Sequence, residues 1–333
     1  MGSHTALALM DAGYQVVVLD DLSTGHREAV AGAEVVVADV ADRAGLARAL
    51  EEAGRLDALI HFAARTRVDE SMRDPGLYFR VNVGGTLNLL EAALAAGIRH
   101  FVFSSSAAVY GEPERVPIHE THRLAPTSPY GQSKLVVESL LPWYEQAHGL
   151  KWVSLRYFNA AGADPLGRSG EDHHPETHLI PSILLCALGR RGPVAIFGTD
   201  WPTPDGTCIR DFVHVCDLAE AHRLALEYLA RGGGSAAFNL GSGRGFSVRQ
   251  VIELCRRVTG VDIPVQHAPR RPGDPAALVA ACDRARAELG WQARYPSLES
   301  MVETAWAWHR AHPYGFQGSG SLPPGTAGQG LDP

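Results

Sequence analysis

The residues best suited to do chemistry together are a tyrosine and a lysine four positions apart in the stretch SPYGQSKLVVE, residues 128–138. Ser128 is a preferred N-cap and Pro129 suits the first position of a helix, so a helix is expected to start here. Residues i and i+4 of a helix share one face, which places Tyr130 beside Lys134. A phenol with its usual pKa of about 10 is a poor base at neutral pH, and a neighbouring ammonium lowers that pKa by stabilising the phenolate. The pair is therefore predicted to move a proton.

Two further candidates stand where predicted strands end. The stretch RHFVFSSSAAVYG ends a strand in Ser104, Ser105 and Ser106, and any of these hydroxyls could share a proton with Tyr130. Asp20 closes the strand YQVVVLD. A carboxylate there can accept hydrogen bonds from a ribose diol and repels a 2′-phosphate, which favours NAD over NADP. A serine cluster or a strand-end acid is by itself an ordinary turn residue, so both assignments depend on the elements that position them.

Short β-branched runs alternate with longer helical stretches from residue 14 onward. The runs are YQVVVLD, AEVVVAD, LDALIHFAA, RHFVFSSSA and KWVSLRYFN, and helical patterns such as TLNLLEAALAAG lie between them. Strands that are continuously apolar and separated by helices predict a parallel sheet with helices on both faces. We therefore expect a Rossmann-type, doubly wound α/β sheet whose carboxyl edge gathers the strand-end side chains.

The first helix, HTALALMDAG, has no strand before it, although a parallel-sheet unit places one there. In a dinucleotide-binding sheet, that strand leads into a glycine-rich turn whose amides hold a pyrophosphate. We expect this first strand and the glycine-rich loop to be missing, with Gly2 as the last glycine of the turn. The expected consequence is weak NAD binding and low stability of the chain as written.

The second half of the chain has a different pattern. After residue 159 come loops rich in Gly, Pro and His, such as AAGADPLGRSGEDHHPETHLIP, followed by short elements and a last helical region. This pattern predicts a smaller C-terminal lobe that builds a substrate pocket over the carboxyl edge of the sheet. The expected division is an NAD-binding domain over residues 1–158, to which a segment from about 208 to 242 returns, a substrate lobe over 159–316 and a disordered tail over 317–333.

Composition argues against several classes of function. The net charge of −7 and the scattered basic residues argue against nucleic-acid binding. No apolar run of about 18 residues exists, so no membrane span is expected. The cluster DHHPETH, with His173, His174 and His178, lacks a cysteine or a regular helical pair of histidines, and we expect no metal there. Five cysteines without a C-x-x-C pair indicate a reducing compartment, so we expect a cytoplasmic location.

A family resemblance rests on stretches that occur in a fixed order along the chain. They include VVVLDDLSTGH, FSSSAAVYGE, SPYGQSK, RYFNAAGAD, PETHLIP, AIFGTDWPTPDGTCIRDFVHV, FNLGSG and RRPGD. From residue 2 to about residue 315, the sequence resembles the UDP-glucose 4-epimerases of the extended short-chain dehydrogenase/reductase family. The resemblance implies NAD as the cofactor, a UDP-hexose as the substrate, and a homodimer formed through the helices that flank the sheet.

The resemblance also implies a site, residue by residue. The Tyr130 phenolate would take the proton of the sugar 4-hydroxyl, directly or through Ser106, with Lys134 beside it, while the C4 hydride passes to NAD and later returns to the other face of a 4-keto sugar. The other implied cofactor contacts are Gly2, Asp20, Asp21, Asp39, Val40, Phe62, Ala63, Ala64, Asn82, Ser104 and Phe158. The implied substrate contacts besides Ser106 are Asn159, Leu179, Phe197, Arg210, Arg271, Asp274 and Leu278.

The chain also departs from the family pattern. Arg65 and Arg67 stand in a loop where the family often carries a lysine near the cofactor, and their role is left open. Leu278 stands where some members place a tyrosine, and this smaller wall predicts that N-acetylated UDP-hexoses are accepted too. Pro142 lies inside the helix of Tyr130 and is expected to bend it two turns past the site.

Three alternative functions compete with this hypothesis. A nucleotide-sugar 4,6-dehydratase needs an acid and a base after the strand, where this chain has Ser106, Ala107 and Ala108, so that reading is disfavoured. A uronate epimerase or decarboxylase stays open, because Arg65 or Arg67 could pair with a substrate carboxylate. The third alternative is a catalytically silent nucleotide-sugar-binding remnant, against which the intact pair of tyrosine and lysine argues.

Overall fold

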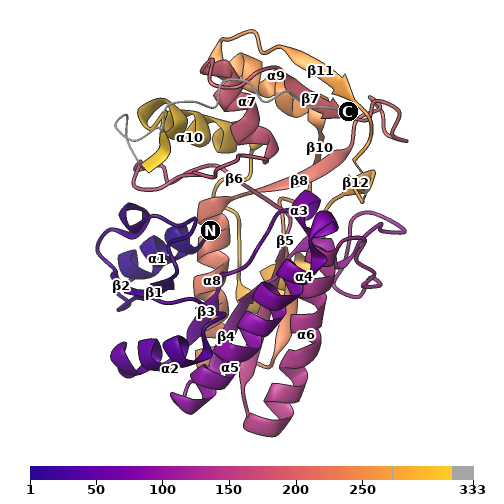
Figure 1. Cartoon of the computed structure of the whole chain (residues 1–333). Helices are drawn as coiled ribbons and strands as arrows, with labels where there is room; N and C mark the ends of the chain where they lie inside the picture. The colour runs from indigo at the N-terminus through magenta and orange to yellow at the C-terminus, as the bar shows by residue number, and fades with distance from the viewer. Residues whose placement is uncertain (272, 317–333) are drawn as a thin grey trace.

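The computed structural model describes residues 1–271 and 273–316, and it has two lobes (Figure 1). The predicted disordered tail, residues 317–333, lies outside the described residues. The lower lobe in the figure holds a four-stranded sheet in the order β3-β4-β5-β9, in which every neighbouring pair is parallel. Its strands are β3 (Leu59–His61), β4 (His100–Ser104), β5 (Lys151–Tyr157) and β9 (Ala236–Leu240).

Helices cover both faces of this sheet. Successive residues of a strand point to opposite faces, so Phe101 and Phe103 of β4 pack into one hydrophobic core while Val102 packs into another. The first core lies against α2, α5 and α6, and the second lies against α8. Apolar side chains on both faces of the strands thus produce the doubly wound arrangement that their sequence predicts. The helices are α2 (Arg43–Glu52), α5 (Gly85–Ala95), α6 (Pro129–His148) and α8 (Val215–Ala230), with the short α3 (Val68–Arg73) and α4 (Pro75–Tyr78) before α5.

A separate parallel pair, β1 (Val17–Asp20) and β2 (Glu34–Val37), follows the first helix, α1 (Gly2–Asp11). Helix α1 packs against α8. Within the described residues, no strand pairs with both β1 and β3, so the parallel strands form two sheets rather than one continuous sheet. This order of elements, with a helix leading into β1, is the one that the sequence predicted.

The upper lobe is built around β8 (Ile209–His214), which pairs with three short strands. The chain enters this upper lobe after β5 and returns to the lower lobe from β8 into α8 and β9. After β9 it goes back to the upper lobe (Figure 1). The partners of β8 are β6 (Asn159–Ala161), β10 (Gly245–Ser247) and β12 (Ala277–Leu278); a second pair joins β7 (Val194–Phe197) to β11 (Val265–Ala268); and the helices are α7 (Leu179–Ala187), α9 (Val248–Thr259) and α10 (Leu298–Ala311).

Three sequence features can be followed in these elements. Helix α6 continues through Pro142 as one assigned helix of 20 residues. All five cysteines are free thiols. Among the described helices, none is both long enough and apolar enough to cross a lipid bilayer.

Candidate active site

The start of α6 places a phenol and an ammonium at the carboxyl edge of the sheet. The Ser128 side chain accepts a hydrogen bond from the Gly131 N–H over 3.2 Å, and Pro129 occupies the first turn, so the helix begins where the sequence predicts. Tyr130 and Lys134 are both buried, one turn apart. The Lys134 Nζ donates a hydrogen bond to a backbone carbonyl at the end of β4 and lies 6.0 Å from the centre of the Tyr130 ring.

The three serines after β4 have three different roles. Ser106 caps a short 3₁₀ turn by accepting the Ala108 N–H over 3.1 Å, and its hydroxyl lies close enough to Tyr130 to lower the pKa of that phenol. The Ser105 hydroxyl instead donates to the Glu138 carboxylate over 2.5 Å. The Ser104 hydroxyl lies 2.7 Å from a second phenol, that of Tyr157. Of the three candidates, Ser106 is therefore the one that can share a proton with Tyr130.

Burial, rather than charge, dominates the protonation of the pair. Burial raises the pKa of the Tyr130 phenol, and the nearby Ser106 hydroxyl works in the opposite direction. Burial lowers the pKa of Lys134 to about 8, although the Glu138 carboxylate attracts its proton. The sequence predicted a Tyr130 pKa lowered by Lys134; the structure differs because both groups are desolvated, which penalises each charged form. Lys134 is therefore the first of the two groups to lose its proton, near pH 8.

A close backbone approach fixes the distance between Tyr130 and Ser106. A Cβ atom at Gly131 would lie only 2.5 Å from the Ala108 carbonyl oxygen, so the first turn of α6 can touch the Ser106 turn only with glycine at this position. The glycine of SPYGQSK thus has a positioning role that the sequence analysis did not assign.

A cavity of about 2500 Å³ is lined by residues of both lobes and contains most of the predicted site. Ser104, Lys134 and Asn82 are buried and do not line it. The predicted residues that line it are Gly2, Asp20, Asp21, Asp39, Val40, Phe62, Ala63, Ala64, Ser106, Tyr130, Phe158, Asn159, Leu179, Phe197, Arg210, Arg271, Asp274 and Leu278.

Residues on the β1 side of the cavity suit a nucleotide with a ribose diol. Asp20 ends β1, and its Oδ1 accepts the Leu22 N–H over 2.7 Å. Gly25 approaches the same carboxylate so closely that a Cβ there would lie 2.9 Å from both oxygens, which leaves this acid in a tight backbone cradle. The backbone N–H groups of the first turn of α1, which begins at Gly2 beside the Phe62 ring, add donors for an anionic group. These residues fit the adenosine and phosphate parts of NAD.

Asn82 supports this site from behind. Its Oδ1 accepts the Arg65 N–H over 2.7 Å, and its Nδ2 donates to the Arg65 carbonyl and to the Ser133 hydroxyl, each over 2.9 Å. Both side-chain N–H groups are therefore used within the protein. Asn82 positions the Arg65 loop against α6, and Arg65 and Arg67 of that loop line the cavity.

Arg210 and Arg271 line the cavity from the upper lobe and are held in different ways. Arg210 is tied down, because its Nη1 donates to the carbonyls of Ile209 and Pro275 over 2.9 and 2.8 Å. The Arg271 guanidinium stacks on the Phe197 ring, 3.7 Å from the ring centre. Stacking holds a guanidinium in place and leaves its N–H fork available for an anion.

Tyr157 is a site residue that the sequence analysis missed. Burial, together with the nearby Tyr130, raises the pKa of its phenol, so Tyr157 stays neutral next to the catalytic pair. The signal was present, because Tyr157 is the last residue of β5 and directly precedes Phe158 at the carboxyl edge.

Comparisons with known proteins agree with this geometry. The model of the NAD dependent epimerase/dehydratase family matches residues 1–241. A UDP-glucose 4-epimerase of Halalkalibacterium halodurans is 52% identical over 316 residues, which cover 95% of this chain and 94% of that protein. A solved structure of a UDP-glucose 4-epimerase aligns with a TM-score of 0.91 at 47% identity, over 95% of this chain and 96% of that one. The Brucella ovis UDP-glucose 4-epimerase, solved in complex with NAD, aligns with a TM-score of 0.88 at 48% identity, over 92% and 94% of the two chains.

Proposed function

The chain belongs to the NAD-dependent epimerase/dehydratase family, and from that premise we propose that it interconverts UDP-glucose and UDP-galactose by transient oxidation at C4. The observation that carries this proposal is the buried pair of Tyr130 and Lys134, with the half-buried Ser106 beside it, at the edge of a cavity that Arg210 and Arg271 also line. An isomerase of this kind needs a proton acceptor, a hydride acceptor and an anchor for the diphosphate. The cofactor is NAD.

The chain's own residues handle the proton. The Tyr130 oxygen accepts the proton of the sugar 4-hydroxyl, either directly or through the nearby Ser106 hydroxyl. The protonated Lys134 stabilises the resulting phenolate from one helical turn away. When bound, NAD supplies reversible acceptance of a hydride from C4 of the sugar. Once the 4-keto sugar has turned over in the cavity, a hydride returned to its other face would invert the configuration at C4, and Tyr130 would give the proton back to the 4-oxygen.

The opposite wall of the cavity anchors the nucleotide. Arg271, whose guanidinium N–H groups have no hydrogen-bond partner among the described residues, binds the diphosphate, while Arg210 stiffens the strand on which it lies. Anchoring at the diphosphate leaves the hexose free to turn over between the two hydride transfers. Leu278, which pairs with Arg210 in the β8–β12 ladder, forms part of the wall beside the hexose.

A homodimer in the cytoplasm completes the proposal. Trp143 on α6 is 68% exposed, and large aromatic side chains are enriched at protein interfaces. Its position on a helix that flanks the sheet supports pairing through that face. Five free cysteines support a reducing compartment. Light scattering of the wild type and of Trp143→Glu tests the dimer, since the variant should elute as a monomer.

The proposed activity is tested by two measurements on one preparation. The purified chain is denatured and the released NAD is quantified per polypeptide, while native protein is assayed for conversion of UDP-galactose to UDP-glucose. Tyr130→Phe should lower kcat by about 10²- to 10⁴-fold, the usual contribution of a general base. Tyr144→Phe, on the same helix but away from the cavity, is the matched control and should keep the wild-type kcat. A Tyr130→Phe variant as active as the control would refute the assigned base.

A further inference from the structure

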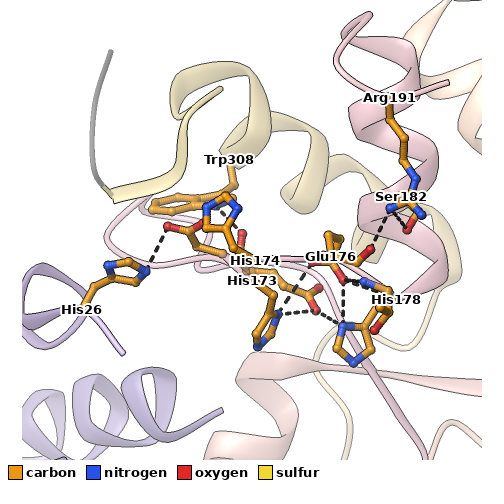
Figure 2. A network of polar contacts seen from close by, with 11 residues as sticks. His26, His173, His174, Glu176, His178, Ser182, Arg191 and Trp308 are labelled. Carbon is orange, nitrogen blue, oxygen red and sulfur yellow. Dashed lines mark hydrogen bonds and ion pairs between the residues drawn. The ribbon is translucent and has the colours of Figure 1, made fainter. Parts of the chain in front are cut away.

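A second cluster of chemically active side chains lies in the loop that leads into α7. It is separate from the proposed catalytic pair, Tyr130 and Lys134. Glu171, His173, Glu176 and His178 each turn one ligand-type atom toward a common point, and the four atoms all lie within 4.8 Å of one another. Figure 2 shows His173, Glu176 and His178 converging within this network. None of these four residues has a part in the proton transfer described above.

The distances within the cluster suit a single small cation. The His178 Nδ1 lies 2.7 Å from the Glu171 Oε1, and the His173 Nδ1 lies 3.3 Å from that oxygen and 3.7 Å from the Glu176 Oε2. Tetrahedral zinc, with bonds of about 2.0 to 2.2 Å to nitrogen and oxygen, places neighbouring ligand atoms about 3.4 Å apart. Two nitrogens and two oxygens at these separations need only small side-chain movements to surround one ion.

The carboxylates are held in place from behind. The Glu176 Oε1 accepts the backbone N–H groups of Thr177 and His178 over 2.6 and 2.7 Å and also lies 2.9 Å from the His178 Nδ1, while the Oε2 lies 3.7 Å from the His173 Nδ1. The Arg191 Nη1 donates to the Glu176 carbonyl over 2.7 Å and to the Ser182 hydroxyl (Figure 2). Contacts of this kind are the outer shell that orients metal ligands.

The loop sorts its acidic and histidine residues onto two sides. Asp172 and His174 are turned away from the cluster: the Asp172 carboxylate meets His26 and His174, each over 3.2 Å (Figure 2). The cluster thus contains two of the three histidines of DHHPETH and excludes the third. His173 and His178 are about half exposed and line the large cavity, so an ion can reach them from solvent.

We infer that Glu171, His173, Glu176 and His178 form a structural zinc site, a function beyond the proposed epimerisation. Imidazole nitrogen favours zinc over magnesium or calcium, which prefer oxygen ligands alone. Two carboxylates and two neutral imidazoles balance the charge of one Zn²⁺. All four positions come from protein, which is the arrangement of a structural site.

The site would brace the substrate lobe. Its four ligands span eight residues that end directly before Leu179, the first residue of α7 and a lining residue of the cavity. The Trp308 Nε1 donates to the Glu171 carbonyl over 3.2 Å, so the same loop is also tied to α10. An ion at the cluster would cross-link this irregular loop and hold the start of α7. This departs from the expectation of no metal drawn from the sequence.

The test uses the full chain, purified without a histidine tag and stripped with a chelator. Zinc chloride is returned, the protein is dialysed, and bound metal is measured by mass spectrometry alongside the Tm. The expected result is about one zinc per chain and a Tm raised by several degrees. His173→Gln and His178→Gln should abolish both effects, whereas His174→Gln, the control in the same loop, should keep them.

Two outcomes would overturn the inference. One is stripped wild-type protein that retains no zinc after dialysis; the other is equal zinc retention in His173→Gln and the wild type. Circular dichroism of each variant shows whether it is folded, and His173 is exposed enough that its replacement should not unfold the lobe. Because zinc content is read without an activity assay, failure here leaves the epimerase proposal untouched.

Discussion

Lys134 donates a hydrogen bond from its Nζ to the backbone carbonyl oxygen of Ser104 over 2.8 Å. This bond ties α6, one turn after Tyr130, to the carboxyl end of β4. The same ammonium lies 4.9 Å from the centre of the Phe103 ring, so it is held among apolar and backbone groups rather than by a carboxylate. Its proton is therefore easier to lose than that of an exposed lysine.

The pH dependence of the reaction should report this lysine. Below pH 8 both the phenol and the ammonium are protonated, and the reactive form, with phenolate and ammonium, contains one proton fewer. We therefore expect kcat/KM for UDP-galactose to rise as the pH passes through about 8. The measurement is a profile of initial rates from about pH 6 to 9.5, a window that spans the lysine pKa on both sides.

Lys134→Met provides the comparison. The variant leaves Tyr130 with a pKa raised by burial and no ammonium beside it, so the rise near pH 8 should vanish and the rate should be low throughout. A wild-type profile that is flat across this range would contradict the assignment of the rise to Lys134. A Lys134→Met profile with the same midpoint would contradict it as well.

Arg271 should control affinity rather than turnover. Its guanidinium stacks on Phe197 with its N–H fork open to the cavity, and a lysine in its place can offer only one point charge. We expect Arg271→Lys to raise the KM for UDP-galactose about tenfold, the cost of roughly one charge-assisted hydrogen bond, with kcat nearly unchanged. Steady-state kinetics at several substrate concentrations separates the two constants.

The neighbouring Arg270 is a matched control. It too stacks on an aromatic ring, that of Trp201 at 4.2 Å, but its Nε pairs with Asp200 and it does not line the cavity. Arg270→Lys should change KM by less than about twofold, because exposed ion pairs contribute little. Equal effects of the two substitutions would show that Arg271 has no special contact with the nucleotide.

Local patterns made much of the site predictable from the sequence. Continuous apolar strands gave the parallel sheet, and its carboxyl edge had to gather the serines and Phe158 because parallel strands all end there. Asp20 ends a strand of the separate β1–β2 pair and reaches the same cavity. The cap and proline before Tyr130 placed the helix start, and helical spacing placed Lys134. These inferences needed only neighbours in the sequence.

What could not be predicted depends on contacts between distant segments. The pKa shifts of Tyr130 and Lys134 come from burial by the whole fold, which no local pattern encodes. The loop from Glu171 to His178 has no regular periodicity, so spacing could not show which of its histidines converge. Asn82 looked like a cofactor contact, yet its N–H groups are used within the protein.

Gly131 should be required for the spacing between the base and its serine. Gly131→Ala puts a Cβ against the Ala108 carbonyl and must push α6 away from the Ser106 turn. Misplacement by a fraction of an ångström to 1 Å costs up to about 10²-fold in rate, so we expect kcat to fall by about that factor. Gly234→Ala, where a Cβ would meet nothing within 4 Å, should leave kcat and the Tm unchanged. A normal kcat in Gly131→Ala would mean that the two segments can separate at no cost.

Removing one partner of the buried ion pair between Glu138 and Arg156 should lower the free energy of unfolding far more than removing one partner of an exposed pair of the same length. The Arg156 Nη2 lies 2.6 Å from the Glu138 Oε2, and both side chains are buried. The Lys151–Glu145 pair, also at 2.6 Å, is partly exposed. Removing one member of a buried pair strands the other charge, so Glu138→Ala should lower the free energy of unfolding by about 3 to 5 kcal/mol.

Urea denaturation of two further variants separates charge burial from packing. Glu145→Ala should cost less than about 1 kcal/mol, because solvent screens the exposed pair. The double variant Glu138→Met with Arg156→Met should be less destabilised than Glu138→Ala, since no unpaired charge remains in the core. If Glu138→Ala and Glu145→Ala cost the same, the pair joining α6 to β5 is screened by water, and the burial that shifts the pKa of Lys134 one turn earlier would be in doubt as well.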